Sequence, residues 1–499
     1  NLTDTPVGYQ PSKGPEVRFT LTYNQRETGQ PANFTWSNVS QKWTHNWLAY
    51  VEDDPGNPYV VPMTYTRGGG HVVYYSPYGF HRANILDPEP QTGAVLTRLP
   101  NNTTTTSYER RFPDGSKEVY ARSDNSPLYP RRWFLTQVVD AQGQTATLGY
   151  DTQNRITSIT DAAGKITTFS YTTADPLLIT KVTDPFGRFA TLAYDASGRL
   201  SNITDAIGIV SSVSYDASSL VNVLTTPYGS SNFSYGLTAI GPGNNIIRWL
   251  ELTDPLGNPE RIEFSGYTAS LAATDPNPPV AENFWMLNFQ LNFINTFYWD
   301  RNVYPITHTD FSKAQITTPL TGDVGGAATS FMHSTKKPLE NRVWYNYQDQ
   351  NWTGYYLTLG NSNKPSAVVQ VLDDGTTRVQ RTTNNIVPDG VPWPPLTIGN
   401  GNITSTTDTK GRKTVYNYAA NNIDVLTVQQ QTDAAGTLTT IAQFGGYNAQ
   451  HRPATYTDAA GQVWQYTYNA AGQLLTAKNP LLQTTTYTYD TKGRLSTVK

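Results

Sequence analysis

The 499-residue chain has no cysteine, and this absence removes several kinds of chemistry at once. A disulfide framework, a thiolate metal site and cysteine catalysis are all excluded, because each requires the thiol. Charged residues make up only 15% of the sequence, and they include no basic run. Because nucleic acids are bound through clustered lysine and arginine, no nucleic-acid partner is expected. No apolar stretch approaches the ~20 residues of a membrane span, so no transmembrane segment is expected either.

The composition favours strands over helices. Aromatic residues reach 12% of the chain, with 32 tyrosines, whereas there are only 3 methionines. Tyrosine and threonine favour extended backbone, and the 38 glycines and 33 prolines supply many chain reversals. The chain is longer than one ordinary domain, so it should form either several domains or a repeat architecture.

A short tyrosine motif returns at a nearly constant interval. Successive copies are separated by 21 or 23 residues in two series, which are Tyr150, Tyr171, Tyr194 and Tyr215, and then Tyr447, Tyr468 and Tyr489. Acidic residues, glycines and arginines return with the tyrosines. The members that we assign to the structural repeat are Asp151, Asp161, Gly164, Asp195, Gly198, Arg199, Asp205, Asp490, Gly493 and Arg494. So regular a spacing indicates a repeat protein.

The turn residues explain what one repeat should be. In each Asp-x-x-Gly, the aspartate can bond its own backbone and the glycine tolerates positive φ, which together make a tight turn. The runs between turns alternate with period two, so that Ala146, Leu148 and Tyr150 share one face. One unit is therefore a two-stranded hairpin, which is stabilised by stacking on its neighbours. Such units should pair laterally into a long antiparallel sheet with their tyrosines in register.

These residues resemble the YD-repeat (Rhs) family, which includes bacterial Rhs proteins, the C component of Tc toxins and animal teneurins. The stretch from Gly187 to Asp205 matches the family motif closely, and Trp43 to Trp47 and Phe112 to Ser116 look like segments that precede the repeats in bacterial members. The resemblance implies an all-β fold, a long antiparallel sheet of tandem hairpins spiralling into a hollow shell. In bacterial relatives that shell holds a C-terminal toxin.

The sequence ends partway through a repeat, at Leu495 to Lys499. It includes neither the self-cleaving core nor the toxin that toxin-bearing members of the family carry, so no catalytic residue is transferred from them. We expect the chain to be part of a longer protein.

Four regions follow from the spacing. Residues 1–135 are expected to form an irregular N-terminal β region, 136–265 a first regular block, 266–400 an irregular aromatic-rich block, and 401–499 a second regular block. Insertions are frequent between Gly257 and Thr407, where the spacing loosens. A short helix is expected near Ala281 to Phe293, where a strand is the alternative.

Candidate sites of chemistry have simpler interpretations. Neither His-x-x-x-His spacing nor a nucleophile motif occurs, and the acid pairs Asp53–Asp54 and Asp373–Asp374 are interpreted as turn residues. The string from Arg67 to His71 fits a flexible loop better than an anion cradle. The repeated aspartates fit turn capping better than calcium binding. The arginine of Gly-Arg-Leu (Arg199, Arg412 and Arg494) is expected to pair with a nearby turn aspartate rather than with a ligand. Tryptophans that either stack on a glycan or fill the interior are Trp285, Trp299, Trp344, Trp352 and Trp393.

The expected function is structural. We expect a shell segment of a secreted or cell-surface bacterial protein, which encloses and protects a C-terminal toxin or other cargo from the remainder of its own chain. The alternative is an extracellular assembly or adhesion module, in which the partners are further copies of the chain or a glycan. Neither catalytic residues, nor a cofactor, nor a metal site is expected, and the chain is not expected to be an enzyme.

Overall fold

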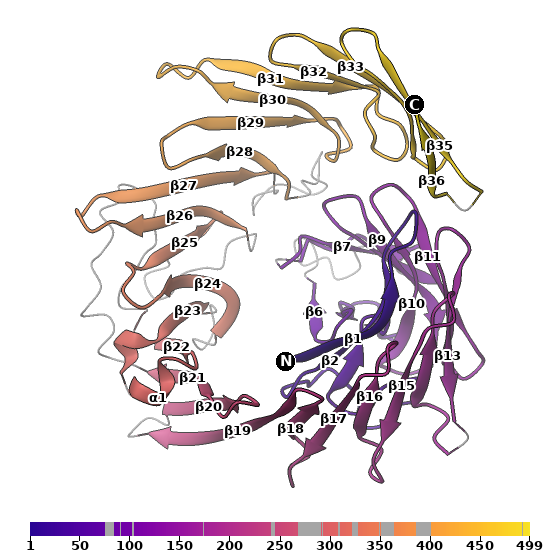
Figure 1. Ribbon diagram of the computed structural model, residues 1–499, viewed down its shortest axis with the longest axis vertical. Coiled ribbons are helices and arrows are strands. Elements are labelled where there is room, and N and C mark those ends of the chain that lie inside the picture. Colours follow the sequence, from indigo (N-terminus) through magenta and orange to yellow (C-terminus); the bar gives the residue numbers. More distant parts are fainter. Residues whose placement is uncertain are drawn as a thin grey trace. The chain divides into compact units, whose positions relative to one another are not determined.

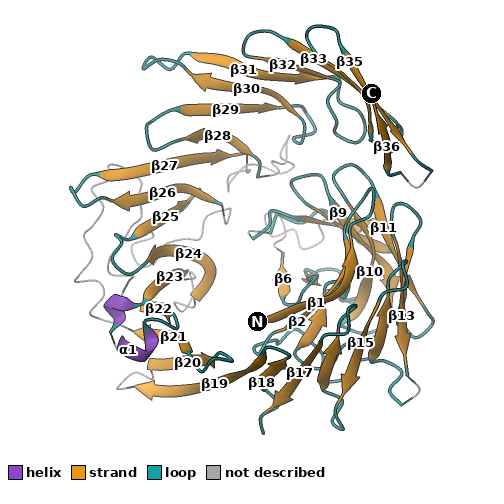
Figure 2. Ribbon diagram, in the orientation of Figure 1, coloured by secondary structure: helices purple, strands orange, loops and turns teal. Residues whose placement is uncertain are grey.

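The structure is a computed structural model that describes residues 1–74, 84–89, 91–101, 104–172, 174–240, 245–267, 291, 293–307, 310–321, 328–348, 350, 364–385, 401–491 and 493–499. Within these ranges the regular secondary structure is almost entirely β-strand (Figure 2). The all-β class expected from the composition and the turn spacing is confirmed.

The first strands lead from the N-terminus through the first regular repeats (Figure 1). They are β1 (Leu2–Tyr9), β2 (Val17–Tyr23), β3 (Trp43–His45), β4 (Tyr50–Asp53), β5 (Met63–Tyr65), β6 (His71–Val73), β7 (Val95–Leu99), β8 (Ser107–Arg111), β9 (Lys117–Ser123), β10 (Arg131–Val139), β11 (Thr145–Tyr150), β12 (Ile156–Thr160), β13 (Ile166–Tyr171), β14 (Ile179–Thr183), β15 (Phe189–Tyr194), β16 (Leu200–Thr204), β17 (Val210–Tyr215) and β18 (Val221–Thr226).

Longer strands and two short helices come next, before the second series of repeats. These elements are β19 (Gly229–Ile240), β20 (Asn245–Thr253), β21 (Pro259–Tyr267), β22 (Phe293–Trp299), α1 (Tyr304–Thr307), the 3-10 helix η3 (Phe311–Lys313), β23 (Gln315–Thr321), β24 (Ala328–Lys336), β25 (Val343–Tyr347), β26 (Pro365–Val371), β27 (Thr377–Asn384), β28 (Ile403–Thr407), β29 (Lys413–Tyr418), β30 (Val425–Gln431), β31 (Leu438–Gly445), β32 (Thr455–Asp458), β33 (Val463–Tyr468), β34 (Leu474–Lys478), β35 (Thr484–Tyr489) and β36 (Leu495–Val498).

The strands pair in chain order into one long antiparallel sheet. From β7 to β36 each strand is hydrogen-bonded to the strand that follows it, and β4 pairs with β10. The strands β1, β2 and β3 form a separate three-stranded sheet. The predicted long antiparallel sheet of tandem hairpins is therefore confirmed. The hollow shell concerns the overall shape and stays a prediction.

The repeats share one register. Ser158 pairs with Thr168, Lys181 with Thr191, and Asn202 with Ser212, each time in the same place within the repeat. A second shared feature was not expected: the register shifts immediately before each motif tyrosine, at Tyr150, Tyr171, Tyr194, Tyr468 and Tyr489. Such an irregularity leaves one residue without a partner in the ladder.

The chain divides into two compact units. Unit 1 contains Asn1–Val213, Asn417–Val428 and Thr440–Lys499, and unit 2 contains Ser214–Tyr416 and Gln429–Thr439. The four-region division expected from the spacing stays a prediction.

Unit 1 has its core between the N-terminal region and the first repeats. The repeat residues Ala146, Ile159, Val182 and Leu200 are at most 2% exposed, and so is Phe19 of β2. Alternate residues of β11, β13 and β15 are buried, as the period-two pattern predicted. The N-terminal strands thus cover one face of the first repeats.

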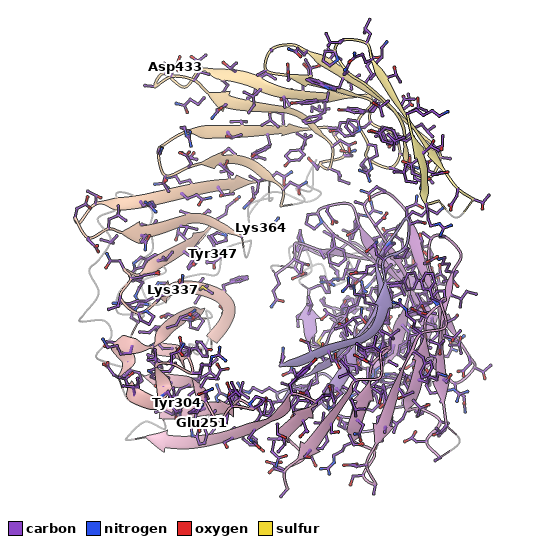
Figure 3. All side chains as sticks on the ribbon, in the orientation of Figure 1. Glu251, Tyr304, Lys337, Tyr347, Lys364 and Asp433 are labelled. Carbon is purple, nitrogen blue, oxygen red and sulfur yellow. The ribbon has the colours of Figure 1, made fainter. Side chains whose placement is uncertain are left out.

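Unit 2 has its own core around Phe297, Trp299, Ile316 and Trp344. The helix α1 adjoins it, and there the Tyr304 hydroxyl donates a 2.6 Å hydrogen bond to Glu251 Oε2 (Figure 3). The helix expected near Ala281 to Phe293 falls almost wholly outside the described residues, and its last residue, Phe293, begins β22. Among the described residues, no helix is long and apolar enough to cross a membrane.

Candidate functional site

Where aspartate follows the motif tyrosine, it closes the first turn of the repeat, and Asn448 and Asn469 cap the same turn in two repeats of the second block. Asp195 Oδ1 accepts hydrogen bonds from the backbone N–H of Ser197 and Arg199 at 2.9 Å, and Oδ2 accepts one from Arg199 Nε at 2.8 Å. Gly198 completes the turn with a φ of 73°. Burial acts to raise the pKa of Asp195, but these hydrogen bonds outweigh it and hold the pKa below its usual value. The carboxylate is fully engaged in the turn.

The same arrangement recurs in other repeats. Asp151 bonds to the N–H and the guanidinium of Arg155, and Asp490 bonds to those of Arg494. Gly493 has a φ of 77°. Arginine therefore pairs with the turn aspartate four residues before it, as expected from the sequence.

The second turn is also closed by an aspartate in most repeats, without arginine at Asp161 and Asp205 but with Arg188 at Asp184. Asp161 Oδ1 accepts from the N–H of Lys165 at 2.8 Å, and Asp205 Oδ1 accepts from that of Ile209 at 2.8 Å. Gly164 has a φ of 80°. Within the described residues, no three histidines, aspartates or glutamates converge on a point that could hold a metal ion. The aspartates therefore act as turn caps.

The motif tyrosines make a contact that sequence reasoning missed. Five of the hydroxyls donate to the backbone carbonyl of the residue fifteen positions earlier, at 2.6–3.0 Å, from Tyr150 to Leu135, Tyr171 to Ile156, Tyr194 to Ile179, Tyr468 to Pro453, and Tyr489 to Leu474. The Tyr447 hydroxyl donates instead to the carbonyl of Val425, 22 positions earlier. Tyr215 ends β17 in the same strand position. The sequence predicted that the tyrosines lie in register, but it did not predict that their hydroxyl groups donate hydrogen bonds to the backbone of the preceding repeat strand. The sequence signal that could have revealed this contact is the constant offset of fifteen residues between these five tyrosines and an earlier apolar residue.

An N-terminal segment, Trp36 to Ser40, crosses the first repeats. Ser37 Oγ accepts a hydrogen bond from the backbone N–H of Ile156 at 3.1 Å, and Ser40 Oγ accepts one from that of Leu200 at 3.3 Å. Between them, the carbonyl of Asn38 accepts from the N–H of Ile179 at 3.1 Å. All five residues of this covering segment are buried. The covering segment thus supplies one acceptor to each of three successive repeats.

The strand β1 crosses the same repeats near their second turns. The carbonyl of Pro6 accepts from the N–H of Ala206 at 2.9 Å, and the Tyr9 hydroxyl donates to Asp161 Oδ2 at 2.9 Å. Burial and this contact raise the pKa of Tyr9. The first regular block is therefore covered by polypeptide near both ends of its strands.

The second regular block has a row of aromatic side chains on one face of its sheet. Phe444, Tyr456 and Trp464 lie in a row with ring centroids 5.3 Å apart at each step. Alternate residues of β33 and β35 are half-buried, whereas the corresponding positions of β11 and β15 include fully buried ones. The aromatic face of the second block is therefore less covered than the first.

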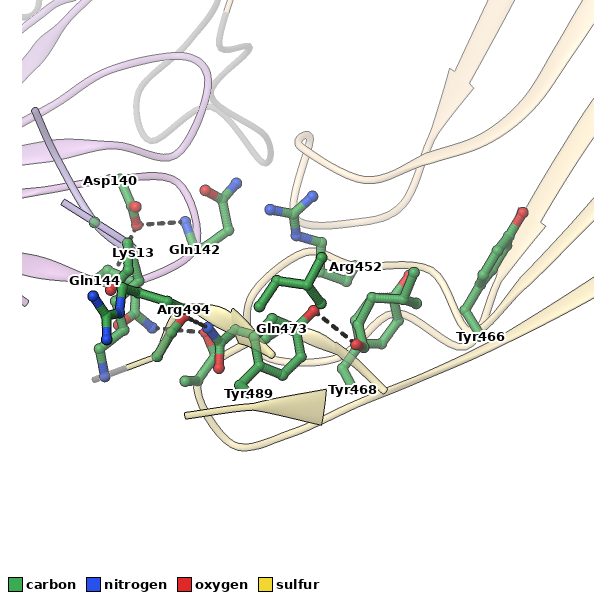
Figure 4. Close-up of a pocket in the computed structure, with 17 residues that line it drawn as sticks. Lys13, Asp140, Gln142, Gln144, Arg452, Tyr466, Tyr468, Gln473, Tyr489 and Arg494 are labelled. Carbon is green, nitrogen blue, oxygen red and sulfur yellow. Dashed lines mark hydrogen bonds between the residues drawn. The ribbon is translucent and has the colours of Figure 1, made fainter. Parts of the chain in front are cut away.

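A cavity of about 640 Å³ lies in unit 1 beside the second block (Figure 4). Its walls include Tyr468, Leu474, Tyr489 and Leu495 of the repeats. On the other side lie three N-terminal residues, Ser12 to Gly14, and the turn from Asp140 to Gln144. Gln144 Nε2 joins the two sides by donating to the carbonyl of Ala471 at 3.2 Å.

The candidate acids have structural partners. Asp53 is not a turn residue, because it ends β4 and is buried; its carboxylate accepts from Arg131 Nε and Nη2 at 2.8 and 2.6 Å, from the Tyr108 hydroxyl at 2.8 Å, and from the indole of Trp133. Asp54 does cap a turn, as predicted. These partners saturate Asp53, so a glycosidase pair here is not supported.

The second acid pair and two of the five tryptophans also have structural positions. Asp374 caps its turn through Thr376, and Asp373 accepts from Asn341 Nδ2 at 2.8 Å. Trp299 and Trp344 are at most 1% exposed, which leaves no ring face for a glycan. Trp285, Trp352 and Trp393 lie outside the described residues.

Two histidines and the glycine-rich string have structural positions. His45 and His333 are fully buried, and burial lowers the pKa of each to about 3, with Arg342 as a second cause for His333. The string from Arg67 to His71 forms a reversal between β5 and β6, as expected for a loop; there the N–H of Gly70 donates to Glu27.

Comparison with known proteins identifies the repeats. The RHS Repeat family model matches residues 134–166, 150–188, 194–231 and 447–481. No curated protein matches the chain. Among solved structures, the chain is similar to one in the Photorhabdus luminescens Tc holotoxin pore, with 12% identity and a TM-score of 0.39. It is also similar to a chain of the TcdB2-TccC3-Cdc42 crystal structure, with 12% identity and a TM-score of 0.40.

These alignments cover 88% and 89% of the present chain, and only 22% of each solved chain. The chain thus spans about a fifth of the length of those toxin chains. The matched segments coincide with the tyrosine hairpins described above. The matched hairpins are RHS repeats, the repeat of the RHS-repeat (YD-repeat) family.

Proposed function

We propose that the chain is a structural shell segment that encloses and protects a polypeptide, a C-terminal toxin or other cargo, within a secreted bacterial protein. The proposal rests on one observation: in unit 1, an N-terminal segment of the chain covers the face of the first repeats. The first block already holds polypeptide against this face, through hydrogen bonds from Ile156, Ile179 and Leu200 to the covering segment. A sheet built to be lined by polypeptide suits a container better than a catalyst.

The engagement of the polar residues supports a non-catalytic role. Turn aspartates are paired with backbone N–H groups or arginine, and Asp53 is saturated by its neighbours. A catalytic acid or nucleophile needs a free, positioned group beside a substrate space. The described residues beside the cavity offer mainly tyrosine rings, amides and cations.

Protease protection tests the proposal in the natural full-length protein. Polypeptide that lies outside the repeats should survive a protease dose that digests the same polypeptide expressed alone. The variant Tyr171→Phe combined with Tyr194→Phe, which weakens the joins between repeats, should shorten that survival. Equal digestion of the two forms of the polypeptide would contradict enclosure.

An assembly module is the second candidate, because one observation favours it. Exposed apolar side chains gather at the second-turn edge of the first block, where Ile166, Phe189 and Val210 each begin a strand and are 41–50% exposed. Phe186 and Ile207, in the adjoining turns, are more exposed still. Exposed apolar groups in such number often mark a protein interface. Negative-stain images should show fibres that Phe186→Ser with Phe189→Ser abolishes; isolated particles in the unmodified protein would rule this candidate out.

A further inference from the structure

The cavity of the second block lies where the covering segment lies on the first block. The sequence Tyr194 to Leu200 of the first block corresponds to Tyr468 to Leu474 and to Tyr489 to Leu495 of the second. In each copy the tyrosine hydroxyl donates to a carbonyl fifteen residues earlier, and the register shifts at the same point. Leu474 and Leu495 are thus the counterparts of Leu200, and both line the cavity.

On the first block, this position holds an extended peptide. Ile156, Ile179 and Leu200 direct their backbone N–H groups at the covering segment, and two of the three acceptors are serine hydroxyls. Trp36 anchors the segment, with its ring 5.5 Å from that of Tyr50 and 5.4 Å from that of Phe134. The first block therefore shows which ligand chemistry the repeat position accepts.

On the second block, the corresponding space is open. Its volume of about 640 Å³ lies within the range of ligand sites in proteins, roughly 300–1,000 Å³. Tyr468 and Tyr489 donate their hydroxyls to Pro453 and Leu474, which fixes both rings as walls of the cavity (Figure 4). Both rings are thus held in place by hydrogen bonds within the repeats.

The cavity is cationic. Lys13, Arg452 and Arg494 line it, with Asp140 as the one acidic residue among the lining side chains. Arg494 is paired with Asp490 at 2.7 Å, and Asp140 Oδ1 is occupied by the N–H groups of Gln142 and Gln144. Among the described residues, neither Lys13 nor Arg452 makes an ion pair. These two cations favour a ligand with negative charge.

We propose that this cavity binds an extended acidic peptide segment that carries serine or asparagine, in the manner in which Trp36 to Ser40 bind the first block. The occupant is a segment of the enclosed polypeptide, and in naming that source the inference rests on the proposed function. Backbone N–H groups at the bulges would bind its hydroxyl or amide oxygens, the tyrosine rings would pack against its apolar side chains, and Lys13 and Arg452 would pair with its carboxylates.

A labelled synthetic peptide tests the proposal with the whole chain. The probe is Glu-Glu-Trp-Ser-Asn-Val-Ser-Glu, and its binding is followed by fluorescence anisotropy. A dissociation constant on the order of 10–100 μM is expected for a site of this size. Arg452→Glu should weaken binding by about tenfold or more, because it reverses one of the two unpaired cations. Leu495→Trp, at a 56% exposed wall position, should fill the cavity and abolish binding.

Lys410→Glu is the matched control, because Lys410 is an exposed cation on a turn of the second block that does not line the cavity. It should leave binding unchanged, and all three variants should melt at the temperature of the unmodified protein. A peptide in which glutamines replace the glutamates should bind more weakly. Absence of binding up to about 1 mM, or equal binding to the unmodified protein and to both cavity variants, would overturn the proposal.

The two proposals fail in different ways. If the peptide binds at the cavity while the full-length protein gives no protease protection, the site stands as a peptide site and the enclosure is wrong. If protection is seen without peptide binding, the enclosure stands and the cavity proposal is wrong.

Discussion

Ser37 and Ile156, 119 residues apart in the chain, are joined by a hydrogen bond in which the backbone N–H of Ile156 donates to Ser37 Oγ at 3.1 Å. The carbonyl of the same Ile156 accepts from the Tyr171 hydroxyl at 2.6 Å. Both backbone groups of the first residue of β12 are therefore satisfied by side chains from outside that strand. The covering segment and the motif tyrosine therefore act on the same point of the repeat.

Removing the tyrosine hydroxyl should destabilise the first block. Tyr171→Phe keeps the ring but leaves the Ile156 carbonyl without this donor, and an unsatisfied buried group costs about 1–2 kcal/mol in the free energy of unfolding. The loss is measured from the midpoint of urea denaturation.

Tyr489→Phe provides the matched comparison for that variant. Tyr489 makes the same bond to Leu474, but Leu474 is half-buried and lines the cavity, where water can replace the hydroxyl, whereas Ile156 is only 2% exposed. Its cost should be under about half of that for Tyr171→Phe. Equal costs would contradict the difference in cover between the two blocks.

Removing the serine acceptors should loosen the covering segment. Ser37→Ala and Ser40→Ala each leave one buried N–H group without its acceptor, so each should cost about 1–2 kcal/mol of unfolding free energy. Ser197→Ala, in an exposed turn of the same block, should cost nothing measurable. The account would be wrong about the segment if the two buried serines behaved like Ser197 in the same denaturation series.

At the turn position Gly198, asparagine should be tolerated better than alanine. Gly198 has a φ of 73°, and a Cβ there would meet no neighbouring atom, so Gly198→Ala should cost about 1 kcal/mol through backbone strain alone. Gly198→Asn should cost less, because Asn154 holds a φ of 57° in the corresponding turn. Thermal unfolding of the two variants distinguishes the cases, and an alanine that melts no lower than the asparagine would contradict this turn geometry.

Acid should unfold unit 1 through His45. Burial lowers the pKa of His45 from 6.5 to about 3, so the unfolded chain binds a proton that the folded chain excludes between these values. Stability is therefore full above about pH 6.5 and falls on acidification by up to about 1.4 kcal/mol per pH unit from this group. The measurement is the urea midpoint at pH 7 and at pH 4.5.

His45→Phe removes the titrating group and should flatten that pH dependence. The ring of His45 lies 5.3 Å from Phe19 and 6.4 Å from Phe169, so phenylalanine suits the surroundings. An unchanged slope between pH 4.5 and pH 7 in this variant would show that other groups cause the acid sensitivity.

The sequence predicted the features that are local to one repeat. The hairpin, the aspartate cap and the pairing of Arg199 with Asp195 all lie within a few residues, so turn chemistry was enough to identify them. The role of Ser37 could not be predicted, because nothing in an isolated serine signals a partner 119 residues away. Asp53 was misread for a related reason: its neighbours Pro55 and Gly56 suggested a turn, while its partner Arg131 lies 78 residues further along the chain. The roles of Ser37 and Asp53 depend on contacts with residues far away in the chain, and the periodicity of the sequence gives no information about such contacts.

The most direct test of the account is the exchange of individual backbone amides with deuterium, since its central claim is that the repeat face is built to be covered by polypeptide. The amides of Ile156, Ile179 and Leu200, which donate to the covering segment, should exchange slowly. Those of Leu474 and Leu495, which line the cavity, should exchange faster in the present chain and become protected when the acidic peptide is added. Fast exchange at Ile156, Ile179 and Leu200, at the same rate as at the two cavity leucines, would contradict the account.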